Sequence, residues 1–142
     1  GSIYILDTES DAIKDNIIID GAASDIAVSK DGKILYISDI VNSRLIIMER
    51  GAKKEIKSII VGNRPHRILL SPDGKILYAA NYHSNNISVI DTESMDAIAL
   101  IPSGILPFDI ALSKDGRWLF SSNYDESSIS IIDTKINRVV ER

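Results

Sequence analysis

Short apolar runs separated by polar turn residues follow one another along the whole chain. In its middle part these runs fall at about 66–70, 75–80, 86–91 and 97–102, and they are rich in Ile, Val, Leu and Tyr. Runs of four to eight such residues, bounded by turn residues, indicate β-strands. No window keeps an apolar period of 3.6 residues, so we expect almost no helix. The pattern therefore predicts an all-β protein.

The runs recur at a fixed spacing of 42 residues. The block Ser-Pro-Asp-Gly-Lys-Ile-Leu-Tyr at 71–78 returns in similar form at 29–36 and 113–120. A second block, Ile-Ser-Val-Ile-Asp-Thr at 87–92, returns at 129–134 with the same spacing. Separate blocks that share one spacing indicate tandem structural repeats.

Each repeat reads as four antiparallel strands joined by tight turns. Pro72 fixes φ at the second position of its turn, and Gly74 accepts a positive φ. Tandem four-stranded units of about 40 residues are typical of β-propeller blades, which bury both apolar faces against their neighbours. A leucine-rich or TPR-type solenoid would show another period, with a Leu ladder or helices. We therefore predict β-propeller blades, each a four-stranded antiparallel sheet.

The repeats divide the chain into about three and a half blades of a single partial propeller. We assign a half blade to 1–21 and full blades to 22–62, 63–104 and 105–142. Closed propellers have four to eight blades, so the chain predicts an open arc with apolar faces at both ends. Because exposed apolar faces are association sites, we expect a homo-oligomer, with a dimer favoured, that forms by stacking of end blades.

The chain opens with Gly1-Ser2, which is typical of a cloning scar. We interpret the sequence as a piece of a longer propeller. The alternative is a natural short chain that completes itself by assembly. A third hypothesis is an engineered or excised piece that was made to study propeller assembly.

Three further blocks are Leu-Tyr-Ala-Ala-Asn at 77–81, Ser-Asn-Asn-Ile-Ser-Val-Ile-Asp-Thr at 84–92, and the segment 104–116. Together they resemble the YVTN-type β-propeller repeat, whose consensus runs roughly G-x-x-P-x-x-V-A-x-S-P-D-G-K-x-x-Y-V-T-N. The chain departs from the consensus at Asp39, where the repeat has Asn, and at Glu49. The resemblance implies a surface-layer-like or lactonase-like seven-bladed propeller located extracellularly, at the cell surface or in the periplasm.

Composition narrows the chemistry further. The 142 residues are 44% hydrophobic and 25% charged, with a net charge of -4, no Cys and two His. The lack of Cys excludes disulfides, thiolate metal sites and Cys nucleophiles. We expect no metal site and no cofactor. A net negative charge argues against nucleic acid as a partner, and no apolar run is long enough for a membrane span.

Ligands of propellers usually bind at the mouth of the central channel, where the links between strands meet. Residues that differ between repeats at these links are the candidates for function. The candidate ligand-binding residues are Arg64, His66, Arg67, Tyr82, His83, Tyr124 and Asp125.

Arg64, His66 and Arg67 form the densest cationic group of the chain. They could hold a carboxylate or phosphate through charge-assisted hydrogen bonds. The alternative is a solvated link in which an Arg pairs with a nearby Asp. Another hypothesis combines His66 and His83 with Asp125 or Asp39 around a metal ion.

No motif in the sequence places a nucleophile or a catalytic triad. The balance is therefore against an enzyme. We predict a non-catalytic propeller scaffold for recognition of a protein or ligand and for self-assembly, as a fragment or oligomerising part of a cell-surface or periplasmic protein. The alternative is a fragment of a lactonase-like or dehydrogenase-type propeller enzyme, since similar repeats occur in such proteins.

Overall fold

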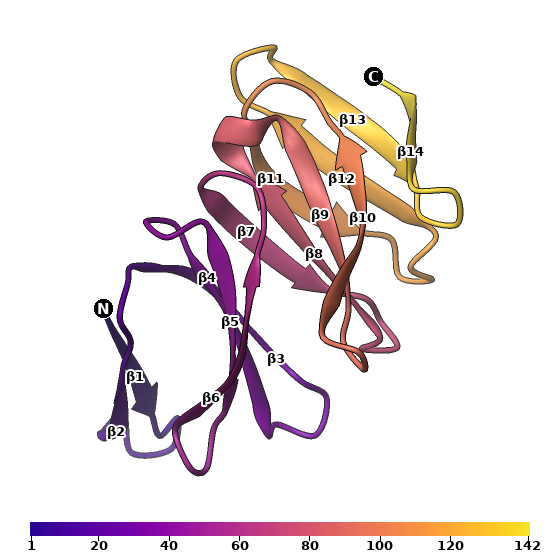
Figure 1. Cartoon of the computed structure of the whole chain (residues 1–142). Helices are drawn as coiled ribbons and strands as arrows, with labels where there is room; N and C mark the ends of the chain where they lie inside the picture. Colours follow the sequence, from indigo (N-terminus) through magenta and orange to yellow (C-terminus); the bar gives the residue numbers. More distant parts are fainter.

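The computed structural model describes all 142 residues and contains fourteen strands in four antiparallel sheets (Figure 1). The first sheet has two strands, β1 (Ser2–Leu6) and β2 (Ile13–Ile18). The second comprises β3 (Ala23–Val28), β4 (Ile34–Asp39), β5 (Arg44–Glu49) and β6 (Lys54–Ile60). The third comprises β7 (Pro65–Leu70), β8 (Ile76–Asn81), β9 (Asn86–Asp91) and β10 (Asp96–Pro102). The fourth comprises β11 (Pro107–Leu112), β12 (Trp118–Asn123), β13 (Ser128–Asp133) and β14 (Arg138–Glu141).

The predicted all-β architecture of propeller blades is confirmed. Each four-stranded sheet is a simple meander of sequential neighbours, and the sheets follow one another in an arc from the N-terminus to the C-terminus (Figure 1). The single helical element is the 3₁₀ turn η1 (Tyr82–Ser84). No helix of the structure is long and apolar enough to span a membrane.

The middle strands read as unbroken apolar runs because both of their faces are covered. Successive strand residues point to opposite faces, so Leu77 and Ala79 of β8 pack toward the second sheet while Tyr78 and Ala80 pack toward the fourth. All four are buried. An alternating pattern of apolar and polar residues would instead have indicated a sheet with one solvent-exposed face.

Three apolar clusters fill the spaces between consecutive sheets. The cluster between the second and third sheets joins Leu45 and Ile47 to Leu77 and Ile90, all four of them 0% exposed. Equivalent clusters lie between the first and second sheets and between the third and fourth. Burial of one such side chain stabilises the fold by about 1.5–3 kcal/mol, so packing between blades supplies much of the stability.

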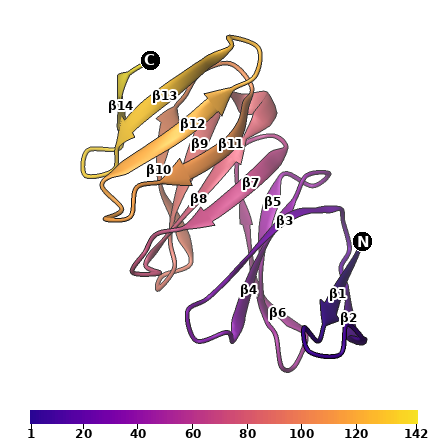
Figure 2. The same cartoon turned by 180° about the vertical axis from the view of Figure 1, so that it is seen from behind.

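The innermost strands β3, β7 and β11 lie beside one another where the sheets converge (Figure 2). Each pairs with the next strand of its own sheet through a ladder that skips one residue, and the skipped residues are Ser24, His66 and Phe108. These residues share one repeat position. A bulge releases its residue from the ladder and re-aims the side chain.

The link between the second and third sheets runs closely over the end of β8. A Cβ atom on Gly62 would lie 2.6 Å from the Asn81 Cβ, so no larger residue fits there without movement. Asn81 is itself buried, and its Nδ2 donates to Asn86 Oδ1 and Ser88 Oγ, both at 2.8 Å. The Gly and the Asn of the repeat are thus a contact pair that ties each link to the sheet that follows it.

Candidate functional site

Residues from three consecutive sheets meet at the end of the arc where the sheet-to-sheet links and the β8–β9 link lie. Ile40 follows β4, Arg64 lies in the link before β7, and His66 is the bulged residue of β7. Tyr82 opens η1, and Phe108 is the bulged residue of β11. We call these five residues the mouth cluster. The cluster lines one cavity of about 280 Å³.

Aromatic rings form the floor of the mouth cluster. The His66 and Phe108 rings come from neighbouring sheets, and their centroids lie 4.3 Å apart at an interplanar angle of 34°. Tyr82 lies 6.1 Å from both of them and meets Phe108 edge to face. Such pairs are worth about 0.5–1.5 kcal/mol beyond area burial. Phe108 nevertheless stays 44% exposed, so a flat apolar surface faces the cavity.

The link that carries Arg64 is held rigidly against η1. The backbone N–H of Tyr82 donates to Arg64 O at 3.0 Å, and that of His83 donates to Asn63 O at 3.1 Å. The Asn63 N–H in turn donates to Ser84 Oγ at 2.7 Å. Arg64 adopts a left-handed backbone with φ of 54°. Leu106, its repeat equivalent, does so with φ of 55°, so the link geometry and not the side chain sets this conformation.

Two arginines of the same strand region have different roles. The Arg67 guanidinium lies 3.4 Å from Asp25 and 3.0 Å from Asp109, and so bridges the inner strands on either side of β7. The Arg64 guanidinium is exposed and engages no hydrogen bond or ion pair within the chain. The alternative of an Arg–Asp pair therefore describes Arg67, whereas Arg64 is free to meet an anion.

Of the remaining predicted site residues, His83 and Tyr124 lie at the edge of the mouth cluster. The ring centroids of His83 and Tyr82 lie 5.2 Å apart, and those of Tyr124 and Phe108 lie 6.3 Å apart. Tyr124 is 70% exposed. Asp125 is exposed, and no hydrogen bond or ion pair joins it to the cluster. Phe108 lies on a link that we expected at the channel mouth, but our candidate set lacked it, and it lacked Ile40 as well. Their positions in the repeat, equivalent to those of His66 and Tyr82, are the signal that could have found them.

Asp39 takes no part in the mouth cluster, because it is engaged elsewhere. Its side chain is fully buried and pairs with Arg44 Nε at 2.9 Å. No group of three His, Cys, Asp or Glu residues in the structure is arranged to hold a metal ion.

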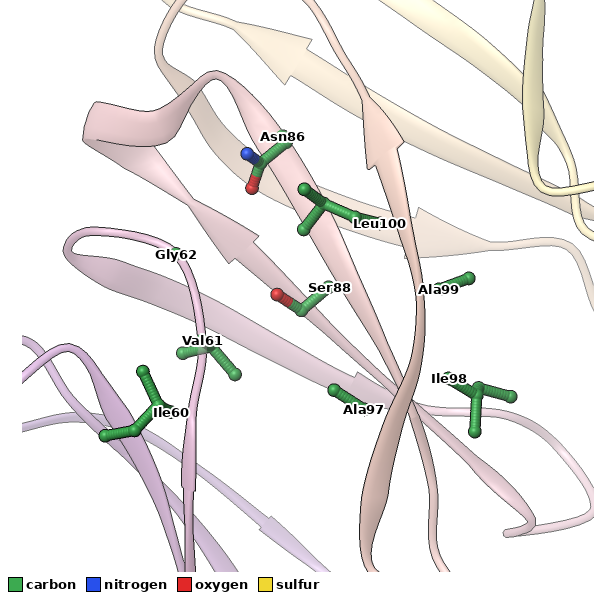
Figure 3. A pocket seen from close by; sticks show the side chains of 9 residues that line it. All are labelled: Ile60, Val61, Gly62, Asn86, Ser88, Ala97, Ile98, Ala99 and Leu100. Carbon is green, nitrogen blue, oxygen red and sulfur yellow. The ribbon is translucent and has the colours of Figure 1, made fainter.

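The largest cavity lies elsewhere, between the outer strands of the second and third sheets, with a volume of about 440 Å³ (Figure 3). Ile60 and Val61 line it from the end of β6 and the link that follows, and Ala97, Ile98 and Leu100 line it from β10. No ionisable side chain lines it, so it offers no group for acid–base chemistry. The mouth cluster is therefore the better candidate site.

Comparison with solved structures places the arc among propellers. A chain of Kuenenia stuttgartiensis hydrazine synthase is 30% identical and superposes with a TM-score of 0.90 over 99% of this chain and 42% of that chain. A functionally unknown protein from Desulfotomaculum acetoxidans is 21% identical, with a TM-score of 0.82 over 93% and 44%. A candidate 6-phosphogluconolactonase from Bacteroides fragilis is 22% identical, with a TM-score of 0.70 over 77% and 34%. The last two likenesses show the fold alone.

The chain spans 34–44% of the length of these three solved chains. No curated protein matches the sequence. The protein family described as "Lactonase, 7-bladed beta-propeller" matches residues 4–99, which is well over half of the chain. On that match, together with its tandem four-stranded sheets, the chain belongs to the family of seven-bladed lactonase propellers.

Proposed function

We propose that the chain is part of a YVTN-type propeller enzyme that opens lactones, with the mouth cluster as its substrate site. Family membership supports the enzyme alternative of the sequence analysis over the non-catalytic scaffold that we had favoured. The observation that carries the proposal is the mouth cavity, whose lining includes both an unpaired arginine and an imidazole.

The residues of the cavity suit hydrolysis of an ester ring. His66 is half-buried, and its ring nitrogens have no hydrogen-bond partner in the chain. In this proposal His66 takes a proton from a water molecule as the water oxygen adds to the lactone carbonyl carbon. Arg64 stabilises the negative charge that develops on the carbonyl oxygen. The ring C–O bond then breaks, and His66 returns the proton to the leaving oxygen, which yields a hydroxy acid.

The proposal predicts which side chains a lactonase assay should require. The purified chain is incubated with a panel of γ- and δ-lactones, and acid release is followed by pH-stat titration. We expect His66→Ala and Arg64→Gln each to lower the rate about a hundredfold, as loss of a general base or an oxyanion donor does. The exposed lysine at position 114 lies on the β11–β12 hairpin at the opposite end, and Lys114→Gln should keep the full rate. A rate that is insensitive to His66→Ala and Arg64→Gln would contradict this assignment.

A second candidate function is a recognition scaffold. The observation that favours it is the exposure of large apolar side chains along the outer strands, where Ile18 is 69%, Ile60 is 74% and Leu100 is 57% exposed. Exposed apolar residues of this kind can form a protein-binding surface. If none of the lactones is opened while a protein partner binds in a manner that Ile60→Lys abolishes, the scaffold function replaces the enzymatic one.

A further inference from the structure

The lining of the mouth cavity combines flat apolar surface with a single positive charge. Four of its five lining residues are Ile40, His66, Tyr82 and Phe108, and the fifth is Arg64. No carboxylate lines the cavity. Of the acids nearby on the inner strands, Asp25 and Asp109 are held by Arg67. The cavity therefore presents one cation that forms no ion pair within the chain.

The polar capacity of the cavity is small. Apart from Arg64, only the His66 imidazole and the Tyr82 hydroxyl can form side-chain hydrogen bonds there. A sugar or another polyol needs a partner for each hydroxyl that it buries, because an unpaired buried hydroxyl costs about 1–3 kcal/mol. A flat conjugated ring needs no such partners and gains contact with the exposed face of Phe108. The lining thus favours aromatic over polyhydroxylated ligands.

The size and rigidity of the cavity also favour a flat aromatic ligand. Its volume of about 280 Å³ lies just below the usual range for small-molecule pockets, about 300–1,000 Å³, which suits a ligand of one or two fused rings. The bulges in β7 and β11 set His66 and Phe108, and three hydrogen bonds fix the Arg64 link to η1. The binding surface is therefore formed before a ligand arrives, which lowers the entropic cost of binding.

We propose that the mouth cavity selects flat aromatic carboxylates, with the ring packed against Phe108 and the carboxylate paired with Arg64. The proposal rests on the proposed function in its choice of site and adds the class of substrate. An arginine guanidinium has five N–H donors, so Arg64 can hold the carboxylate through two parallel hydrogen bonds, which orients a flat ligand, and still donate to the lactone carbonyl oxygen.

Three small probe molecules separate the contribution of the ligand's aromatic ring to affinity from that of its carboxylate. Coumarin-3-carboxylate is a flat aromatic lactone with a carboxylate, coumarin lacks the charge, and paraconate is a lactone acid without an aromatic ring. Isothermal titration calorimetry on the full chain gives the three dissociation constants. We expect coumarin-3-carboxylate to bind at least tenfold more tightly than either of the other two. Equal affinities for all three probes would overturn the proposal.

Variants assign each part of the selectivity to one residue. Arg64→Gln should weaken coumarin-3-carboxylate about tenfold or more, to the level of coumarin, since a hydrogen bond to a charged group is lost. Phe108→Leu should weaken both coumarins several-fold and leave paraconate unchanged. Lys114→Gln serves as the matched control for loss of a positive charge. An unchanged affinity of Arg64→Gln for coumarin-3-carboxylate would refute the role of Arg64.

A fourth probe allows either of the two proposals, the lactonase function and the ligand class, to be refuted without the other. A 2-naphthoate probe carries the aromatic ring and the carboxylate but has no lactone to open. If it binds in an Arg64-dependent manner and no lactone is hydrolysed, the ligand class is supported while the proposed function fails. If lactones are hydrolysed without preference for aromatic acids, the proposed function stands and the ligand class is wrong.

Discussion

Asp39 differs from its repeat equivalents Asn81 and Asn123 because it brings a charge into a fully buried position. Burial alone would raise the pKa of Asp39. Hydrogen bonds from Asn42, the Ala22 backbone and Arg44 outweigh burial and lower the pKa from 3.8 to about 2. Arg44 occupies the repeat position of Asn86, so the departure from the repeat consensus at Asp39 is matched by a second departure that supplies its partner.

This pair predicts a pH dependence of stability. The pKa of Asp39 is lower in the folded chain than in the unfolded one, so its ionised form stabilises the fold above about pH 4. That contribution, roughly 2 kcal/mol for a shift of this size, is lost as the pH falls from about 4 toward 2. Urea denaturation of the wild type and of Asp39→Asn between pH 2 and 7 measures it. The free-energy gap between the two should shrink as the pH falls, and a gap that does not change with pH would exclude the effect.

A double substitution tests whether the two departures are a matched pair. Asp39→Asn alone leaves the Arg44 guanidinium, which is 19% exposed, without its carboxylate. We expect a loss of about 2–3 kcal/mol in the free energy of unfolding at pH 7. Adding Arg44→Asn recreates the arrangement of Asn81 and Asn86, so the double variant should recover at least half of this loss in urea denaturation. Strictly additive losses would show that the two residues do not act together.

Among the elements, the links between sheets are the most constrained. Gly62 leaves no room for a Cβ beside Asn81, whereas a Cβ on Gly51 would meet only the flexible Glu49 side chain at 3.2 Å. We expect Gly62→Ala to lower the free energy of unfolding by about 1–3 kcal/mol, because the link must shift away from the buried Asn. Gly51→Ala is the matched control and should change it by less than about 0.5 kcal/mol. Similar urea midpoints for the two variants would show that the link can shift at little cost in stability.

Sequence patterns predicted the strands closely because the strands follow local rules. The run at 86–91 coincides with β9, and the strand expected at 97–102 begins one residue earlier as β10. The Ser-Pro-Asp-Gly turn is also local, since Pro72 and Gly74 carry its dihedral preferences. Apolar content, period and turn residues together suffice for elements of this kind.

The bulges and the site were harder to predict because they depend on contacts between strands. Nothing in the types of Ser24, His66 and Phe108 marks them as the residues that the ladders skip. In the sequence alone, nothing distinguishes the role of Arg64 from that of Arg67. Only the approach of Asp25 and Asp109 from neighbouring sheets separates the paired arginine from the free one. Repeat alignment could have added Phe108 to the site, but not the stacking of its ring on His66.

At the scale of the whole molecule, the outer face of the fourth sheet is apolar and uncovered. Ile129 is 59% exposed, while its repeat equivalents Leu45 and Ile87 are 0% exposed beneath the next sheet. Phe120 shares this face and is equivalent to the buried Tyr36 and Tyr78. We propose that the 142-residue chain, studied alone, self-associates through this face, since another sheet of the same repeat is the surface that covers it elsewhere in the arc.

Light scattering coupled to gel filtration tests this association. The wild-type chain at micromolar concentration should run at a multiple of 15.6 kDa. Ile129→Lys should shift it toward the monomer, because a charge cannot be buried in an apolar contact without a partner. Ile60→Lys on an outer strand, where the wild-type side chain is 74% exposed, is the matched control and should leave the mass unchanged. A monomeric wild type would refute this proposal.

The skipped residue in each inner strand has a consequence for how such proteins diversify. The side chain at this position belongs to no ladder pair, and the three examples here are as unlike as a hydroxyl, an imidazole and a phenyl ring. Exchanging it should alter what the channel recognises while the scaffold keeps its backbone pairing. A library randomised at Ser24, His66 and Phe108 would therefore explore new specificities while the ladder pairing of each inner strand is kept.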